Sequence, residues 1–213
     1  MDALALLLAD SRFPSGGYAH SLGLEQAVTD GLTDVPAFVR ARMRLVAEAD
    51  ARFAVSARRG EDLPMLDEEW CARCPSPALR DAARRLGSGL LRSAMTVWDD
   101  PRIAAYRDAS TATPRPIALG VVGAVAGLDD EAVALLSLYD DAATVTSAAL
   151  KLLPLDPAVT ARWLAELAPA MERAARAAAA DVRPVAEQPA PAAVAIEVAA
   201  PVHQQRRERL FAS

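Results

Sequence analysis

The chain has 213 residues and a formal net charge of −5, and its composition already excludes several classes of protein. The length corresponds to one domain of about 100–200 residues, enough to bury a core without disulfides or a structural metal. The acidic balance argues against a protein that tracks nucleic-acid phosphates, while 49 alanines and only 5% aromatic residues favour closely packed helices.

Neither a secretion signal nor a membrane span is expected. The apolar run at residues 3–9 follows an aspartate instead of a basic segment and stops at Asp10. The longest uncharged stretch in the middle of the chain, residues 116–128, has 13 residues, whereas a spanning helix needs about 20. We therefore expect a cytoplasmic protein without membrane contact.

Turn and capping signals divide the chain into roughly eight or more helices, and almost no segment alternates as a strand does. Aspartates at 34, 129 and 156 and prolines at 77 and 157 are placed to begin helices. The predicted helices cover residues 1–10, 19–30, about 34–60, 63–74, 77–97, about 101–109, 117–128, 129–152 and 157–181, with a loop at 110–116.

Residues 117–128 are apolar on every side, which is typical of a helix at the centre of a bundle. Residues 77–97 instead place apolar side chains on one stripe and charges on the other side. The sequence thus predicts an all-α, single-domain bundle around a central apolar helix.

The composition changes after residue 182, which divides the chain into an all-α domain, 1–182, and a Pro/Ala-rich segment with a C-terminal tail, 183–213. We expect the prolines of this segment to break any long helix: Pro184, Pro189, Pro191 and Pro201. The tail ends in three arginines and a Leu-Phe pair. It is either flexible or gains order by docking on a partner.

Residues suited to catalysis or metal binding are few. His20 and His203 are far apart in the sequence, and Cys71 and Cys74 form a lone C-x-x-C without the two further ligands of a zinc site. No phosphate-binding or dinucleotide-binding glycine motif is present. We expect no catalytic residue, no metal site and no cofactor in the chain itself.

One segment carries more polar side chains than a structural helix needs. Residues 14–27 read Pro-Ser-Gly-Gly-Tyr-Ala-His-Ser-Leu-Gly-Leu-Glu-Gln-Ala, and the paired glycines permit a tight turn. Tyr18, His20, Ser21 and Glu25 follow within one short stretch, where Gly23 allows close approach. They form either an internal polar network or a contact patch for a partner.

This segment, with Leu-Leu-Leu-Ala-Asp-Ser at residues 6–11, resembles the N-terminal signature of the urease accessory protein UreF family. Residues 85–91, 115–120, 148–154 and 209–213 support the resemblance in the same order. It implies an all-α homodimer that is not an enzyme. Such proteins assemble with UreD (also called UreH) and the GTPase UreG on apo-urease, and are thought to couple GTP hydrolysis to nickel insertion.

The resemblance also implies which residues bind partners and where nickel is held. Partner-binding residues are expected at both chain ends and before the proline at 154: Tyr18, His20, Glu25, Lys151, Arg209, Leu210 and Phe211. Lys151 is expected to face UreG, and Pro14, Gly16, Gly17 and Gly23 are expected to shape the turn. Nickel is expected to be held by the assembled complex.

Two other readings stay open. The first is a direct nickel-binding metallochaperone or an enzyme built around His20, Glu25 or the two cysteines. The second is a helical ligand-sensing regulator that lacks its DNA-binding part, which only the all-α content suggests.

Overall fold

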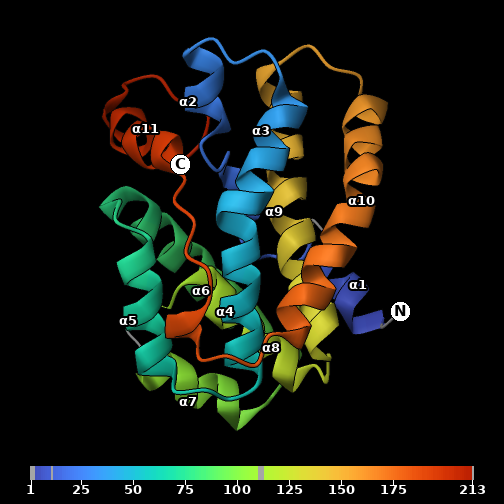
Figure 1. Ribbon diagram of the computed structural model, residues 1–213, viewed down its shortest axis with the longest axis vertical. Helices are drawn as coiled ribbons and strands as arrows, with labels where there is room; N and C mark the ends of the chain where they lie inside the picture. Colours follow the sequence, from blue (N-terminus) through green and yellow to red (C-terminus); the bar gives the residue numbers. More distant parts are fainter. Residues whose placement is uncertain (1–2, 11, 110–112, 213) are drawn as a thin grey trace.

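Helices make up nearly all the regular structure in the computed structural model, which describes residues 3–10, 12–109 and 113–212 (Figure 1). The α-helices are α1 (Ala3–Ala9), α2 (Leu24–Thr29), α3 (Val35–Arg42), α4 (Glu48–Arg58), α5 (Leu63–Arg73), α6 (Pro77–Val97), α7 (Pro101–Ala109), α8 (Arg115–Val125), α9 (Asp130–Leu152), α10 (Pro157–Ala180) and α11 (Val194–Gln205). Short 3-10 turns form η1 (Gly17–Ala19) and η3 (Val185–Glu187), and a π-helical segment, η2 (Met43–Ala47), joins α3 to α4.

No strand occurs in the described ranges, so the all-α prediction is confirmed there. None of the helices in those ranges is long and apolar enough to cross a bilayer.

The predicted caps account for most helix starts. Asp34, Asp129 and Asp156 each accept a hydrogen bond from a backbone N–H in the first turn of α3, α9 and α10, at 2.8–2.9 Å. Pro77 occupies the first position of α6, where its missing N–H leaves no bond unmade. The helix predicted at 129–152 is found at Asp130–Leu152.

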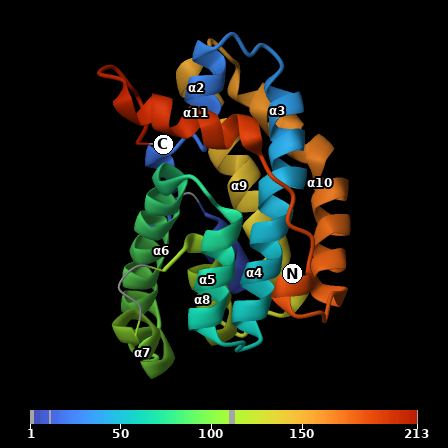
Figure 2. The ribbon, with the colours of Figure 1, turned by 60° about the vertical axis from the view of Figure 1, so that its left-hand side comes forward.

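The central apolar helix is α8, in which every residue from Pro116 to Gly123 is buried. It packs chiefly against α4 and α6 (Figures 1 and 2). At Gly120 a side chain would overlap the carbonyl oxygen of Ala54, so α4 and α8 approach this closely only because glycine stands there.

Helix α4 separates two apolar clusters by presenting different faces to each. Phe53, Ala54 and Ala57 join the cluster around α8, which also takes in α5, α6 and α7. Ala51 and Val55 join a second cluster with α3, α9 and α10. Figure 1 shows the resulting order, with α4 between α5 and α6 on one side and α9 and α10 on the other.

The prediction of a helix over residues 19–30 is wrong in its first half. Leu22 has φ 53° and Gly23 has φ 93°, both in the left-handed region, so a right-handed helix cannot pass through them. The regular helix begins only at Leu24 and ends at Thr29.

The prediction that the C-terminal prolines break any long helix is wrong at Pro201. Helix α11 runs through this residue, although proline removes one backbone hydrogen bond at a cost of about 3 kcal/mol. The packing of α11 against α2 and α6, which buries His203, offsets that cost. Pro184, Pro189 and Pro191 lie outside the α-helices, as expected.

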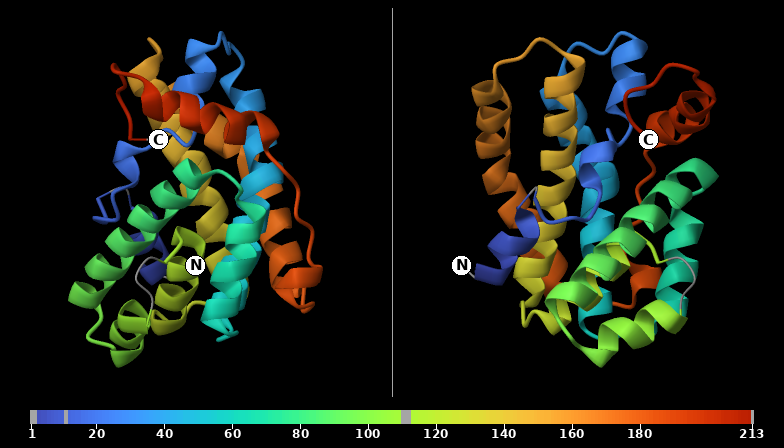
Figure 3. Two further views of the ribbon diagram at one scale, coloured as in Figure 1. Left: turned by 90° about the vertical axis from the view of Figure 1, so that its left-hand side faces the viewer. Right: turned by 180° about the vertical axis from the view of Figure 1, so that it is seen from behind.

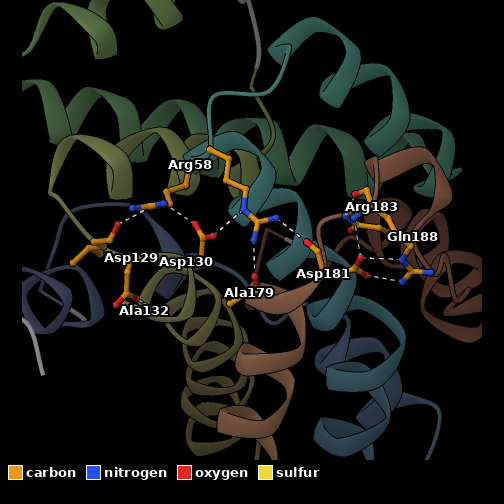
Figure 4. Close-up of polar contacts among 10 residues, drawn as sticks. Arg58, Asp129, Asp130, Ala132, Ala179, Asp181, Arg183 and Gln188 are labelled. Atoms are coloured by element: carbon orange, nitrogen blue, oxygen red, sulfur yellow. Dashed lines mark hydrogen bonds and ion pairs between the residues drawn. The ribbon is translucent and has the colours of Figure 1, made fainter.

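Polar contacts join the ends of α4, α9 and α10 (Figure 4). Arg58 donates to the Leu128 carbonyl oxygen and to Asp130, both at 2.7 Å. Arg59 contacts the other oxygen of Asp130 at 2.8 Å and donates to the carbonyl oxygens of Ala179 and Asp181 at the end of α10. Because the last carbonyls of a helix lack internal partners, Arg59 closes the C-terminus of α10.

We expect Arg59→Ala to lower the free energy of unfolding by about 2 kcal/mol, because two carbonyls and one carboxylate lose a charged donor. Urea denaturation followed by circular dichroism measures the loss. Arg44→Ala is the matched control, since exposed Arg44 bonds only to its own helix and should cost under about 0.5 kcal/mol. Equal losses in both variants would contradict the proposed closure of α10.

Candidate partner-binding site

The N-terminal turn is fixed against α6. Ser93 of α6 donates to the carbonyl oxygen of Pro14 at 2.6 Å. Gly16 has φ 86°, a value that side chains strongly disfavour, and Gly17 then begins η1. The turn therefore requires a glycine at Gly16, whereas at Gly17 a side chain would make only an ordinary van der Waals contact.

The chain then bends again before α2, and this second bend receives the C-terminal region. Gly23 lies in left-handed conformation, and a side chain there would come within 3.2 Å of Ile196 on α11. The absence of a side chain at Gly23 thus allows α11 to pack directly over the start of α2 (Figure 2).

Glu25 is the central polar group of the site. Its buried carboxylate accepts hydrogen bonds from the backbone N–H of Leu210 at 2.6 Å and of Phe211 at 3.1 Å. The Nε2 atom of His203 lies 2.7 Å from the same carboxylate. One acidic side chain therefore holds both the end of α11 and the tail, which is residues 206–213.

Further contacts fix the tail beside η1. The N–H of Ala212 donates to the carbonyl oxygen of Ala19 at 2.8 Å, and the ring of Phe211 is buried in the second apolar cluster. Lys151 donates to the Tyr18 carbonyl oxygen at 3.0 Å, and its Nζ lies 5.1 Å from the centre of the Phe211 ring, a cation–π contact. Figures 2 and 3 show the C-terminal end next to the N-terminal turn.

Around this docked tail, several apolar side chains face solvent. Tyr18 is 75% exposed and Leu210 is 59% exposed. Among the described residues, exposed Arg209 donates to the carbonyl oxygen of Gln204 at 3.3 Å, and no ion pair with a described carboxylate engages its guanidinium. Helix α11 adds a stripe of exposed valines spaced four residues apart: Val194, Val198 and Val202.

The environment shifts the pKa values of Glu25 and His20 downward for different reasons. Burial by itself would raise the pKa of Glu25, but hydrogen bonds from Leu210, His203 and Phe211 together hold it below its usual value. Burial lowers the pKa of His20 to about 4, and the positive charges of Arg85 and Arg115 add to the effect. At neutral pH, Glu25 is thus ionised and His20 is uncharged.

The structure brings five of the seven predicted partner-binding residues into one network of contacts: Tyr18, Glu25, Lys151, Leu210 and Phe211. His20 is buried at the end of η1, and Arg209 lies on the exposed tail. Sequence reasoning missed His203, because 178 positions separate it from Glu25. Two facts could have pointed to this pair: a buried acid needs hydrogen-bond donors, and the chain has only two histidines.

The described ranges contain no group of three or more His, Cys, Asp or Glu side chains placed to hold a metal ion. Cys71 lies in α5 and Cys74 follows it, and both are free. Burial raises the pKa of both, that of Cys74 to about 12, so they are thiols at neutral pH. Because a thiolate is the reactive and metal-binding form, neither cysteine is activated.

We expect Glu25→Gln to release the tail, because the amide has no charge and its NH₂ would face the N–H donors of Leu210 and Phe211. Hydrogen exchange at residues 206–212 should become at least about tenfold faster, which corresponds to about 1.4 kcal/mol. Glu131→Gln, which removes a long and exposed ion pair with Arg176, is the control. Unchanged protection of the tail in Glu25→Gln would contradict the assignment.

His20 should make stability depend on pH. Because its pKa is about 4 in the folded state and about 6.5 when unfolded, the unfolded chain alone binds the proton between these values. The contribution of His20 to stability should therefore fall by about 2 kcal/mol between pH 7 and pH 5, while Asp50, whose pKa is raised to about 6, acts in the opposite direction. Urea denaturation at both pH values should show a smaller fall for His20→Gln. An identical fall in the variant would refute this role of His20.

Comparison with known proteins gives the family. A family model described as UreF matches residues 30–168. The urease accessory protein UreF of Mycobacterium marinum is 37% identical over 217 residues, which cover 99% of this chain and 98% of that protein. The protein of the same name from Mycobacterium sp. strain JLS is 38% identical, and the match covers 98% of this chain and 97% of that protein. The protein of the same name from Mycobacterium tuberculosis H37Rv is also 38% identical, and the match covers 84% of this chain and 88% of that protein.

These matches span the N-terminal turn, the central helices and the C-terminal region, so they include the site described above. The chain belongs to the UreF family of urease accessory proteins.

Proposed function

We propose that the chain is a non-catalytic assembly factor for urease that joins UreD (UreH) and the GTPase UreG to apo-urease during nickel insertion. Its relatives carry the name of an accessory protein and not of an enzyme, which supports an auxiliary role. In this proposal the chain acts in the cytoplasm as a homodimer, recruits UreG and couples its GTP hydrolysis to metal delivery. The assembled complex, and not this chain alone, holds the nickel.

The observation that carries the proposal is the surface that the docked tail completes. The tail and α11 lie over the N-terminal turn because Glu25 holds them there. Tyr18 and Leu210 are exposed at the docked tail, and α11, which packs over α2, carries three exposed valines. Exposed apolar side chains gathered in one region mark contacts between proteins.

Within this surface, we assign UreD to the apolar part on α11 and the tail, and UreG to the neighbouring cations. Since no described carboxylate pairs with Arg209, it can donate to a carboxylate of a partner. The ammonium of Lys151 already supports Tyr18 and Phe211, so it contributes to UreG binding chiefly by fixing their positions. His20 contributes from beneath, as a buried support at the end of η1.

The test is co-expression with UreD followed by pull-down. Val198→Asp on α11 should weaken UreD binding at least about tenfold, because it places a charge in an apolar contact. Val97→Asp is the matched control. Val97 is also a helical valine with an exposed side chain, since its exposed fraction is 49% against 67% for Val198, but it lies at the end of α6 and not on α11. Removal of the last ten residues should also abolish the complex.

Binding that survives both Val198→Asp and the truncation would show that UreD does not use this surface. Stoichiometric, submicromolar nickel binding by the purified chain in isothermal titration would contradict the assignment of nickel to the complex and would favour a metallochaperone.

A further inference from the structure

A cavity of about 140 Å³ lies beneath the C-terminal region, and Glu25, which holds the tail, does not line it. Its walls come from the end of α3, from η2, α4, α5, α6, α8 and α9 and from the N-terminal segment at Gly17 and Leu22, and residues 190–197 contribute from the C-terminal region. In Figure 1 the segment that follows α10 runs along α4 to reach α11 and so passes this region. A cavity of about 150 Å³ can hold a benzene ring, so the space suits a molecule of about six heavy atoms.

Two ion pairs on the cavity wall neutralise each other and offer little to a ligand. Arg42 contacts Asp141 at 2.7 Å through several hydrogen bonds, and Arg115 contacts Asp140 at 2.7 Å. The third arginine on the wall, Arg73, donates to a backbone carbonyl and lies over the ring of Phe53. Each of the three arginines therefore has an acceptor, although one amine of Arg115, Nη1, is buried without a hydrogen-bond partner among the described residues.

Two carboxylates on the same wall remain without a cation. Asp50, on α4, and Glu197, on α11, have no lysine, arginine or histidine within ion-pair distance in the described part of the chain. One oxygen of Asp50 accepts a hydrogen bond from Trp70 Nε1 at 2.9 Å, which leaves the other oxygen for a further donor. Burial raises the pKa of Asp50 to about 6, although the hydrogen bond from Trp70 and the charge of Arg42 act in the opposite direction.

Both carboxylates line the same cavity. Burial is the main cause of the high pKa of Cys74, and the negative charges of both Asp50 and Glu197 raise it further. Both carboxylates therefore act on the same thiol. The rest of the wall is largely apolar, with the aromatic rings of Phe53 and Trp70 and the leucines Leu79, Leu86 and Leu119.

We propose that this cavity binds a small organic cation, a protonated amine or an amidinium on a short apolar body, whose N–H groups donate to Asp50 and Glu197. The aromatic rings suit such a cation through their negatively polarised faces, and the leucines would hold its apolar part. A bare metal ion fits less well, since the described residues offer no cluster of three ligands.

The ligand would also join the C-terminal region to the bundle. Asp50 belongs to α4 and Glu197 to α11, so a cation between them bridges two elements that no ion pair otherwise links in the described chain. Because the ligand would contact both elements, its binding stabilises the packing of α11 on the bundle. This inference stands apart from the proposed role in urease assembly.

The experiment uses n-butylammonium as the probe and the full chain without partners. Isothermal titration at pH 7.5 should detect binding by the wild-type chain, and Asp50→Asn should weaken it at least tenfold. Asn keeps the size of the side chain and can accept the bond from Trp70, so this variant should fold. Asp81→Asn on the exposed face of α6 is the matched control and should bind as the wild type does.

Two further readouts separate a specific site from apolar binding. Affinity should fall about tenfold from pH 7 to pH 5, because the ligand needs ionised Asp50, whose pKa is about 6. Hydrogen exchange at residues 190–205 should slow when the ligand binds, and should slow less in Glu197→Gln. Failure of 10 mM butylammonium to bind, equal affinity in Asp50→Asn, or equal binding of 1-butanol would each overturn the proposal.

Discussion

The buried carboxylate of Glu25 is the constraint on which the candidate site depends. A carboxylate inside a protein is costly unless donors surround it, and the hydrogen bonds that outweigh its burial come from His203, Leu210 and Phe211. All three donors belong to the last eleven residues. The N-terminal turn and the C-terminal tail are therefore ordered together, because neither satisfies its polar groups without the other.

Polar anchors also explain how a segment of low complexity takes one path across the bundle. Residues 183–205 are mostly alanine, proline and valine, and valines 194, 198 and 202 face solvent, so burial of apolar groups alone holds them weakly. At the beginning, Asp181 pairs with Arg183, and Gln188 donates to the Arg183 carbonyl oxygen (Figure 4). At the far end, Glu25 captures His203. Between these fixed points α11 accommodates Pro201 within a helix.

The parts of the fold that sequence could predict are those fixed by neighbouring residues. Asp129 caps its own helix, and the apolar run predicted as a central helix at 117–128 is buried from Ile117 to Gly123, in a helix that ends at Val125. The start of α2 could not be predicted, because the left-handed conformation of Leu22 depends on contacts elsewhere in the chain. For the site, the family resemblance predicted the partner-binding residues. It did not predict that Glu25 accepts hydrogen bonds from the tail or that His203 is its partner, because a pairing across 178 positions leaves no local sequence pattern.

The conformation of Leu22 shows how the turn, the tail and the cavity share one support. Arg42 donates to the Leu22 carbonyl oxygen at 3.2 Å while it pairs with Asp141 on α9. The buried ion pair between Arg42 and Asp141 therefore fixes the bend that precedes α2. This bend in turn places Glu25 within hydrogen-bond distance of the tail. Gly17 and Leu22 also form part of the cavity wall. One short segment thus contacts the tail through Ala19 and contributes Gly17 and Leu22 to the cavity wall, so both features depend on the same backbone.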